Sequence, residues 1–209
     1  MKLRGKLLTR DFFLRDTLIV ASDLLGVCLI VLHEQVLAGD FPGGAVELER
    51  ERCAGAGRIV ECEAYLGFSD KACHSYKANP KGRTNVMYGP GGHAYIYMIY
   101  GLYNCINAVT REEGVPEAVL IRALEPLWDE DKRKYSGPGK LCREAGITRA
   151  DYGCDLCAEK PSRIIMVRPE NFVSPEIVAA KRIGVDYSEE AKDFLYRFYD
   201  KNSPSVSKR

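Results

Sequence analysis

The sequence has no long hydrophobic segment. Its most apolar stretch, residues 18–32, contains Asp23 and Gly26 and is shorter than the ~20 residues that a membrane-spanning helix needs. The first residues are not followed by an uninterrupted apolar core or a small-residue cleavage site, so no secretory signal is expected. These absences predict an intracellular protein with no membrane partner, whose thiols stay reduced.

An excess of charge of one sign is also missing. The chain has 30 basic and 29 acidic residues, which give a formal net charge of +1. A polyanionic partner would therefore need a local basic patch. Two candidate patches occur, and the plainer alternative is that both consist of solvated surface charges. The first contains Lys77, Lys81 and Arg83, and the second contains Lys132, Arg133, Lys134, Lys140 and Arg143.

A second Cys-x-x-Cys pair is missing, although the chain has 8 cysteines. Structural zinc usually takes its ligands from two such pairs, and this chain has only Cys154 with Cys157. Cys142 and one further residue could complete a zinc site. The expectation is instead a loop with two free thiols, and neither a metal nor a cofactor is predicted.

The 209 residues and the hydrophobic fraction of 46% are enough for one domain, residues 1–209, with a real core. Helices are expected at residues 17–25, 137–145 and 175–182, and strands at 27–34, 58–66, 94–100, 104–110, 118–124 and 163–167. The charged segment 47–52 is expected to be a loop that returns the chain as a hairpin, and the tail from Asp200 to be extended. This pattern predicts an α+β fold with a curved, mostly antiparallel sheet and surrounding helices.

The predicted strand at residues 58–66 is the most informative segment. Alternation gives it an apolar face with Val60, Cys62, Ala64 and Leu66, and a polar face with Glu61, Glu63 and Tyr65. The loop after Gly67 then brings His74. Carboxylates beside aromatic rings could hold a flat ring and activate a water next to it. His74 alone would more often be a structural or surface histidine.

A tyrosine-rich hairpin is the second signal. The strands at 94–100 and 104–110 carry Tyr95, Tyr97, Tyr100 and Tyr103 around a tight turn. A half-buried sheet with wetted hydroxyls would explain Tyr95 and Tyr97, which share a strand face. It explains Tyr100 less well, because a large aromatic residue at a turn gains little from packing. An exposed aromatic wedge beside a basic loop could instead enter a base stack.

Arg122 interrupts the apolar strand at 118–124, where an arginine is seldom buried unless it is paired. Glu61, Glu63 and Glu125 are possible partners. A structural ion pair and a catalytic arrangement of arginine, carboxylate and water are both compatible with this position. Asn107, on the return strand of the hairpin, could contact the edge of a base, although a satisfied sheet asparagine is commoner.

Five segments occur in the same order as in one known family. They are residues 58–74, 95–107, 120–126 and 137–141, and the late Ser203-Pro204 pair. They closely resemble the alkyladenine (3-methyladenine) DNA glycosylases of the single-domain mammalian type, over residues 8–207. The resemblance implies a monomeric base-excision-repair enzyme whose partner is double-stranded DNA with damaged purines. It would act in the cytoplasm or nucleoid of a prokaryote, or in the nucleus of a eukaryote.

In that family an alkylated or deaminated purine, of the 3-methyladenine or hypoxanthine type, is flipped out and its N-glycosidic bond is hydrolysed. The resemblance implies that Glu63 is the general base and that Arg122 helps to hold the water and the carboxylate. Tyr65 would stack on one face of the flipped base, with His74 and Tyr97 on the other. Tyr100 would wedge into the duplex, and Asn107 would reject the exocyclic amine of guanine. Glu61 has no catalytic role in the family.

The chemistry fits a monofunctional enzyme, because no lysine lies near Glu63 on the site strands to form a Schiff base. Two other classes of function compete. A nucleic-acid-binding module would also use basic loops and tyrosines, but it would not need Glu63 and Arg122 together. A small-molecule glycosidase needs two carboxylates, and Glu61 with Glu63 is the formal candidate. Residues two apart on a strand, however, lie side by side rather than across a substrate.

Two features depart from the family pattern. The excursion at residues 41–57 looks longer than the family's first hairpin, which should leave the pocket untouched. Ser205 stands where an aromatic residue is common, which puts the packing of the tail in question.

Overall fold

The computed structural model describes residues 2–33, 41–77, 80, 82–157 and 162–209. The strands are β1 (Leu3–Leu7), β2 (Cys28–Leu32), β3 (Ala45–Leu48), β4 (Cys53–Tyr65), β5 (Ala94–Ile99), β6 (Tyr103–Thr110), β7 (Glu117–Pro126), β8 (Tyr135–Ser136), β9 (Ile164–Pro169), β10 (Ile177–Ala180) and β11 (Arg197–Asp200). The α-helices are α1 (Arg10–Phe13), α2 (Thr17–Asp23) and α3 (Pro138–Ala145). Single 3-10 turns lie at Pro42–Gly44, Arg50–Arg52, Gly67–Ser69, Asn85–Tyr88, Arg149–Asp151 and Glu189–Asp193.

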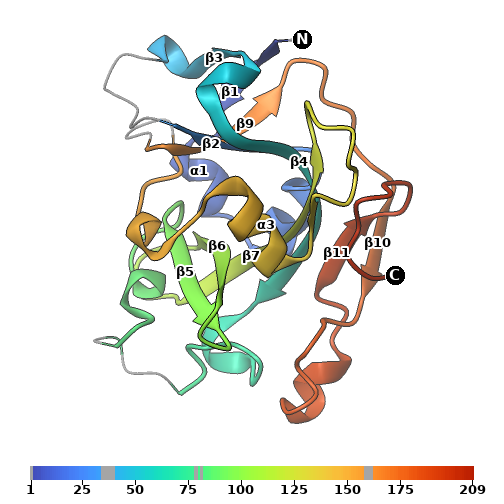
Figure 1. Ribbon diagram of the computed structural model, residues 1–209. Helices are drawn as coiled ribbons and strands as arrows, with labels where there is room; N and C mark the ends of the chain where they lie inside the picture. The colour runs from blue at the N-terminus through green and yellow to red at the C-terminus, as the bar shows by residue number, and fades with distance from the viewer. Residues whose placement is uncertain (1, 34–40, 78–79, 81, 158–161) are drawn as a thin grey trace.

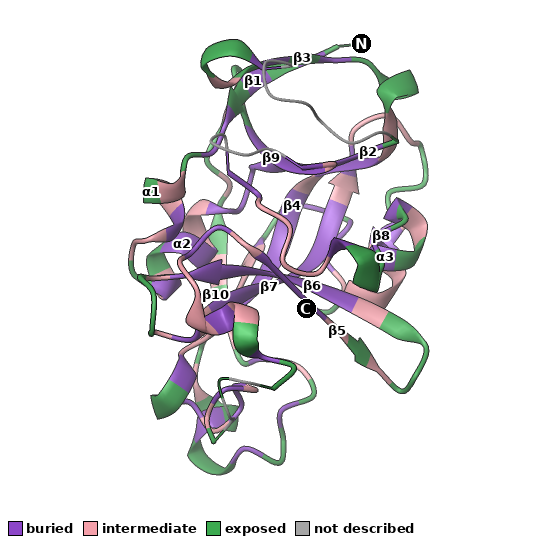
Figure 2. Cartoon of the chain, turned by 90° about the vertical axis from the view of Figure 1, so that its left-hand side faces the viewer, coloured by how far each residue is buried: buried purple, intermediate pink, exposed green. Residues whose placement is uncertain are grey.

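The strands form one sheet in the order β3-β1-β9-β2-β4-β7-β6-β5, and every pairing in it is antiparallel (Figure 1). A side branch, β10 with β11, attaches to β4, and the short β8 attaches to β7. The helices α2 and α3 both pack on the largest apolar cluster, which also takes in side chains of β2, β4, β6 and β7. Figure 2 shows these central strands mostly buried and the end of the β5–β6 hairpin exposed. The predicted antiparallel sheet is therefore confirmed, but the described chain is mostly sheet with few helices.

Two of the expected helices are confirmed. The helix α2 begins after Asp16, whose carboxylate accepts the backbone N–H groups of Leu18 and Ile19, as an N-cap should. The helix α3 starts at Pro138 and ends at Ala145, and the following Gly146, with a φ of 71°, provides a left-handed C-cap. The helix expected at 175–182 is wrong. That segment contains β10, because its backbone pairs with β11, which is distant in the sequence and is itself held by β4.

The expected hairpin from residues 47–52 into the 58–66 strand is not formed, because β3, the strand before β4, pairs with β1 and not with β4. The strand β4 begins at Cys53 and pairs with β2. The segment expected as a plain loop contains part of β3, which pairs with β1, because alternating Val46 and Leu48 are buried there. None of the described residues from 41 to 57 borders the cavity that Glu63 and Tyr65 line.

The prediction of an extended tail from Asp200 is wrong. It runs through turns and folds back on the domain, where Ser203, Ser205 and Val206 are buried. Ser205 is well packed without an aromatic ring, because its Oγ donates a 2.5 Å hydrogen bond to the carbonyl of Lys132. The tail therefore covers part of the sheet behind β4.

The two faces of β4 differ from simple alternation at one point. In the pairing of β4 with β7, Val60 of β4 and Arg122 of β7 have no opposite residue. Each strand therefore has one bulge, and the register after the second bulge is the same as before the first. Ile59 therefore packs in the main core with Cys62 and Ala64. Val60, expected on that face, packs with Ala123 and Val206 instead. The bulge at Arg122 lies directly beside the two glutamates of β4.

Candidate active site

A single row of side chains crosses the sheet and forms the centre of the site. The strand registers place Tyr95 opposite Asn107, Asn107 opposite Leu120, and Leu120 opposite Glu63. Directly opposed residues in antiparallel strands point to the same face, with Cβ atoms about 5 Å apart. The four strands β5, β6, β7 and β4 therefore present these residues to one space.

That space is a cavity of about 460 Å³. Its volume is in the usual range for pockets that bind small molecules. All seven residues predicted from the sequence border it: Glu63, Tyr65, His74, Tyr97, Tyr100, Asn107 and Arg122. They come from β4, β5, β6, β7, the tip of the hairpin and the loop after β4, so only the folded sheet brings them together.

Glu63 is fully buried and holds fixed partners. Its Oε1 accepts the backbone N–H of Ile183 at 2.7 Å, and its Oε2 accepts the hydroxyl of Tyr65 at 2.8 Å. Nη1 of Arg122 lies 3.3 Å from the same Oε2. A buried carboxylate is tolerated only when it is paired and hydrogen-bonded, and these contacts meet that requirement.

Arg122 lies between the two glutamates, so its partners are Glu63 and Glu61. Its Nε donates to Oε1 of Glu61 at 3.1 Å. Burial alone would lower the pKa of Arg122, but Glu63 and Glu61 outweigh it and raise that pKa. Glu125, the third candidate partner, pairs with Arg58 instead, at 2.6 Å. Arg122 therefore stays cationic beside Glu63.

Glu61 does not border the cavity. Its carboxylate also accepts the Nη1 of Arg197 at 3.2 Å and the backbone N–H of Ser207 at 2.7 Å. It is fully buried and tied to the folded-back tail. The two glutamates share a strand face, but only Glu63 faces the cavity.

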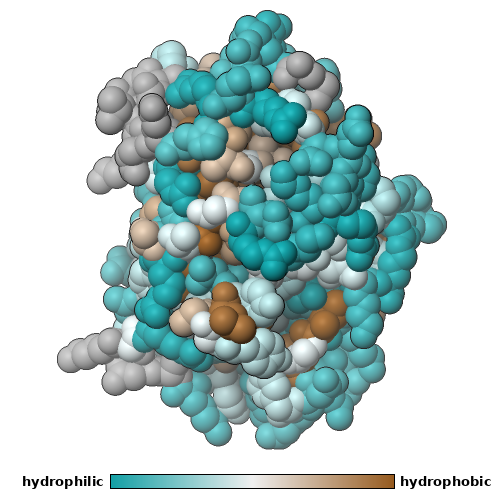
Figure 3. Space-filling model, viewed as in Figure 1, coloured by the Kyte–Doolittle hydropathy of each residue, from teal (hydrophilic) through white to brown (hydrophobic). Residues whose placement is uncertain are grey.

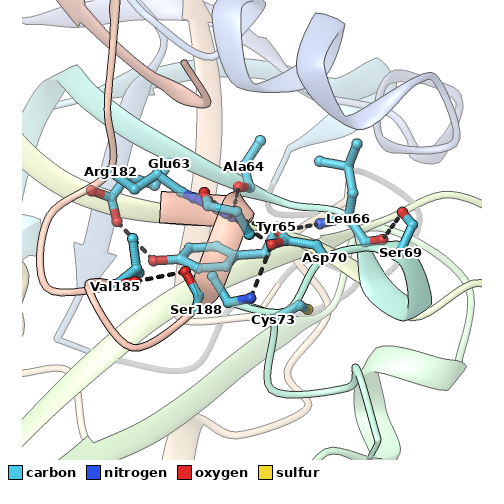
Figure 4. A network of polar contacts seen from close by, with 12 residues as sticks. Glu63, Ala64, Tyr65, Leu66, Ser69, Asp70, Cys73, Arg182, Val185 and Ser188 are labelled. Atoms are coloured by element: carbon cyan, nitrogen blue, oxygen red, sulfur yellow. Dashed lines mark hydrogen bonds and ion pairs between the residues drawn. The ribbon is translucent and has the colours of Figure 1, made fainter. Parts of the chain in front are cut away.

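Aromatic side chains form the walls of the cavity. The ring of His74 lies 4.5 Å from the ring of Tyr97 in an edge-to-face contact, and its Nδ1 is 3.0 Å from the hydroxyl of Tyr95. Burial, reinforced by the nearby Arg83 guanidinium, lowers the pKa of His74 to about 4, so the ring is neutral at pH 7. Burial and the Glu63 carboxylate raise the pKa of Tyr65, which keeps its hydroxyl protonated as a donor (Figure 4).

Asn107 is buried at the floor of the cavity with its amide group fixed. Its Nδ2 donates to the carbonyl of Tyr95 at 3.0 Å and lies 3.5 Å from the carbonyl of Cys105. Both amide protons therefore point to the backbone, which leaves Oδ1 as its remaining polar atom. The amide nitrogen of Asn107 therefore has hydrogen-bond partners within the sheet, and the same side chain borders the cavity.

Tyr100 is 88% exposed at the tip of the β5–β6 hairpin. Its φ of 51° and the φ of 69° at Gly101 put both central residues of the turn in the left-handed region. Such positions favour Gly, Asn or Asp, so neither packing nor backbone preference explains a tyrosine here. Leu102 beside it is also exposed, and Figure 3 shows a hydrophobic patch at the hairpin tip next to hydrophilic surface.

Several cavity residues were not predicted from the sequence. The loop after β10 contributes Ile183, Gly184, Val185 and Tyr187, and other segments contribute Cys73, Met87 and Pro138. Residues 175–182 were expected to be a helix, whereas they contain β10, whose pairing with β11 sets the position of the loop that follows. No local pattern marks Ile183, because it acts through its backbone N–H.

The predicted basic patches are partly engaged in local bonds. Arg83 of the first patch acts electrostatically on His74, while Lys81 lies outside the described residues. In the second patch, Arg133 and Lys140 donate to backbone carbonyls, Lys134 pairs with Asp129 and Arg143 pairs with Glu144. Four of the five basic side chains of the second patch therefore have local partners.

The Cys154–Cys157 pair lies away from the cavity. Burial raises the pKa of Cys154 to about 11, so its thiol is protonated at pH 7. Within the described residues, no group of three or more His, Cys, Asp and Glu side chains is arranged to hold a metal ion. In the same part of the chain, no helix is long and apolar enough to span a membrane.

Comparison with known proteins gives a consistent result. Residues 35–204 match the family described as Methylpurine-DNA glycosylase (MPG). A Clostridium novyi protein named "Putative 3-methyladenine DNA glycosylase" is 45% identical over 98% of this chain and 100% of its own length. Proteins of the same name from Methanocella arvoryzae and Bdellovibrio bacteriovorus are 48% and 40% identical, each over 97% of this chain and over 96% and 100% of their own lengths. The chain belongs to the methylpurine-DNA glycosylase family.

Proposed function

We propose that this DNA glycosylase flips alkylated or deaminated purines, of the 3-methyladenine and hypoxanthine type, out of duplex DNA and hydrolyses the N-glycosidic bond with water. One observation carries the proposal. Glu63 is a buried carboxylate held by Tyr65, Ile183 and Arg122 at the floor of a cavity with aromatic walls. A carboxylate has about four acceptor positions, so these three contacts leave room for a water.

Glu63 takes a proton from that water as it attacks the anomeric carbon. The sugar develops oxocarbenium character as the purine leaves, and the carboxylate also stabilises that charge. Arg122 pairs with the carboxylate and orients it. A purine alkylated at N3 or N7 is cationic, so it leaves as a neutral base and is attracted to the faces of tyrosine rings. Hypoxanthine is neutral, so it leaves as an anion that takes a proton from the solvent.

Extrusion of the base precedes this chemistry, because water cannot reach a base inside a duplex. Tyr65 on one side and His74 with Tyr97 on the other hold the flat ring. Tyr100 inserts into the gap in the base stack, and Asn107 excludes the exocyclic amine of guanine. The role of Glu61 is structural, since its carboxylate is occupied by Arg122, Arg197 and Ser207. This occupancy argues against a glycosidase that uses two carboxylates.

The test uses an end-labelled duplex with one hypoxanthine, incubated with the purified protein, and a matched duplex with adenine as control. We expect hypoxanthine release and a strand that breaks only after hot alkali. Strand cleavage without alkali would show lyase chemistry and contradict the water mechanism. Size-exclusion chromatography of the same preparation checks the expected monomer.

A further inference from the structure

A buried arginine lies behind the ring of Tyr65. The side chain of Arg182 is fully buried, and its Cζ lies 4.7 Å from the centroid of that ring. Arg182 itself does not border the cavity, whereas Tyr65 does. A flat guanidinium over a ring is a favourable contact, and the low exposure strengthens it. The guanidinium therefore supports Tyr65 from outside the cavity.

Asp70 fixes the guanidinium in place. Nη1 of Arg182 lies 2.5 Å from Oδ2 of Asp70, and Nη2 lies 2.8 Å from Oδ1, which is a bidentate pair (Figure 4). The same two nitrogens donate to the carbonyls of Ala64 at 2.9 Å and Ala191 at 3.1 Å. Four hydrogen bonds from a planar group leave it one orientation.

Asp70 is anchored in turn. Its carboxylate accepts the backbone N–H of Leu66 at 3.1 Å and that of Ala72 at 3.0 Å. These two residues flank the turn that follows β4, so Arg182 joins the end of that strand to the loop after β10. Tyr65 is the last residue of β4. Its ring is therefore held by Arg182, and its hydroxyl is held by Glu63.

We propose that Arg182, anchored by Asp70, is a positioning residue that holds the Tyr65 ring as a fixed wall for the flipped purine. This inference rests on the proposed function. Stacking on the purine contributes to the rate of excision only when the aromatic ring stays within about 0.5 Å of its productive position. Arg182 does not touch the substrate and acts through Tyr65. Lys181, the residue before Arg182, is held separately, because its carbonyl accepts a hydrogen bond of 2.8 Å from Nε of Arg197.

The test compares two lysine substitutions. Arg182→Lys keeps a charge for Asp70 but loses the planar fork and the ring contact. Arg163→Lys is the matched control, since Arg163 makes a similar two-point pair with Asp151, at 2.6 and 2.8 Å, and also donates to a backbone carbonyl, away from the cavity. We expect single-turnover excision of hypoxanthine to fall about tenfold or more for Arg182→Lys and to stay within about twofold of the unmodified protein for Arg163→Lys. Each variant is assayed at the same interval below its own Tm.

A double-variant cycle distinguishes positioning from a general structural role. If Arg182 acts through Tyr65, adding Arg182→Lys to Tyr65→Ala should slow excision by no more than about threefold beyond Tyr65→Ala alone. Equal rates for Arg182→Lys and Arg163→Lys, or fully additive losses in the cycle, would overturn the inference. If Arg182→Lys does not fold, Asp70→Asn against Asp151→Asn makes the same comparison. Absence of excision by the unmodified protein would instead refute the proposed function.

Discussion

The hydroxyl of Tyr65 donates a hydrogen bond of 2.8 Å to Oε2 of Glu63, its neighbour on the same face of β4. The residue proposed to stack on the purine and the residue proposed to activate water are therefore joined directly. Residues two apart on a strand point the same way, so this link follows from the strand itself. A purine seated against Tyr65 would lie at a fixed position relative to the carboxylate.

The first prediction separates the two glutamates. Glu63→Gln should slow excision by on the order of a hundred- to ten-thousand-fold, because an amide cannot take a proton from water, while lesion binding stays nearly intact. Glu61→Gln should keep substantial activity, since Glu61 does not border the cavity. Glu61→Gln should nevertheless lower the Tm, because Arg122, Arg197 and Ser207 all donate to its carboxylate. Single-turnover excision and thermal unfolding measure both effects, and an inactive Glu61→Gln beside an active Glu63→Gln would reverse the assignment.

Tyr100 should matter for extrusion rather than for chemistry. Base–aromatic stacking is worth roughly 1–3 kcal/mol, so Tyr100→Ser should lower lesion binding and excision from duplex by on the order of tenfold. The defect should be smaller when the lesion lies opposite a gap, where unpairing is already easy. Tyr65→Ala, which removes a cavity wall, should slow excision in both contexts. Equal defects of Tyr100→Ser on paired and gapped substrates would leave the exposed tyrosine without a wedge function.

The stability of the protein should depend on His74 below neutral pH. Burial lowers the pKa of His74 to about 4, whereas an unfolded histidine titrates near 6.5. Between these values the unfolded chain takes up a proton that folded His74 refuses, so the free energy of unfolding falls as the pH drops from about 6.5 towards 4. His74→Gln should therefore lose less Tm between pH 7 and pH 5 than the unmodified protein. His33→Gln, at an exposed histidine, is the control and should behave like the unmodified protein.

Asn107 should control the choice of base. Its buried amide borders the cavity, so Asn107→Ser should admit the exocyclic amine of guanine and reduce the preference for hypoxanthine over guanine by about tenfold. The measurement is excision of each base from otherwise identical duplexes opposite thymine. Asn104→Ser on the same hairpin is the control, because Asn104 does not border the cavity. An unchanged preference in Asn107→Ser would remove Asn107 from the selectivity of the site.

Much of the fold could be predicted from local sequence. The Asp16 cap and the glycine after α3 mark helix ends that depend only on nearby backbone groups. The strands β5, β6 and β7 follow from apolar and aromatic runs between turn residues. The strands β3 and β10 could not be predicted in this way, because each is stabilised by a partner distant in sequence, β1 for β3 and β11 for β10.

Local motifs and the family resemblance were enough to name Glu63, Tyr65, His74, Tyr97, Tyr100, Asn107 and Arg122, all of which border the cavity, but not Ile183 or the rest of the loop after β10. The resemblance favoured Glu63 over Glu61, and the structure supplies the reason why Glu63 alone of the two borders the cavity. The pairing of β4 with β7 leaves out Val60 and Arg122. The tail from Asp200 folds back, so the backbone N–H of Ser207 donates to Glu61. The contact of Arg182 with the Tyr65 ring and the hydrogen bond from the N–H of Ile183 to Glu63 also arise only in the folded chain. Such contacts depend on long-range pairing energies, which no local pattern in the sequence encodes.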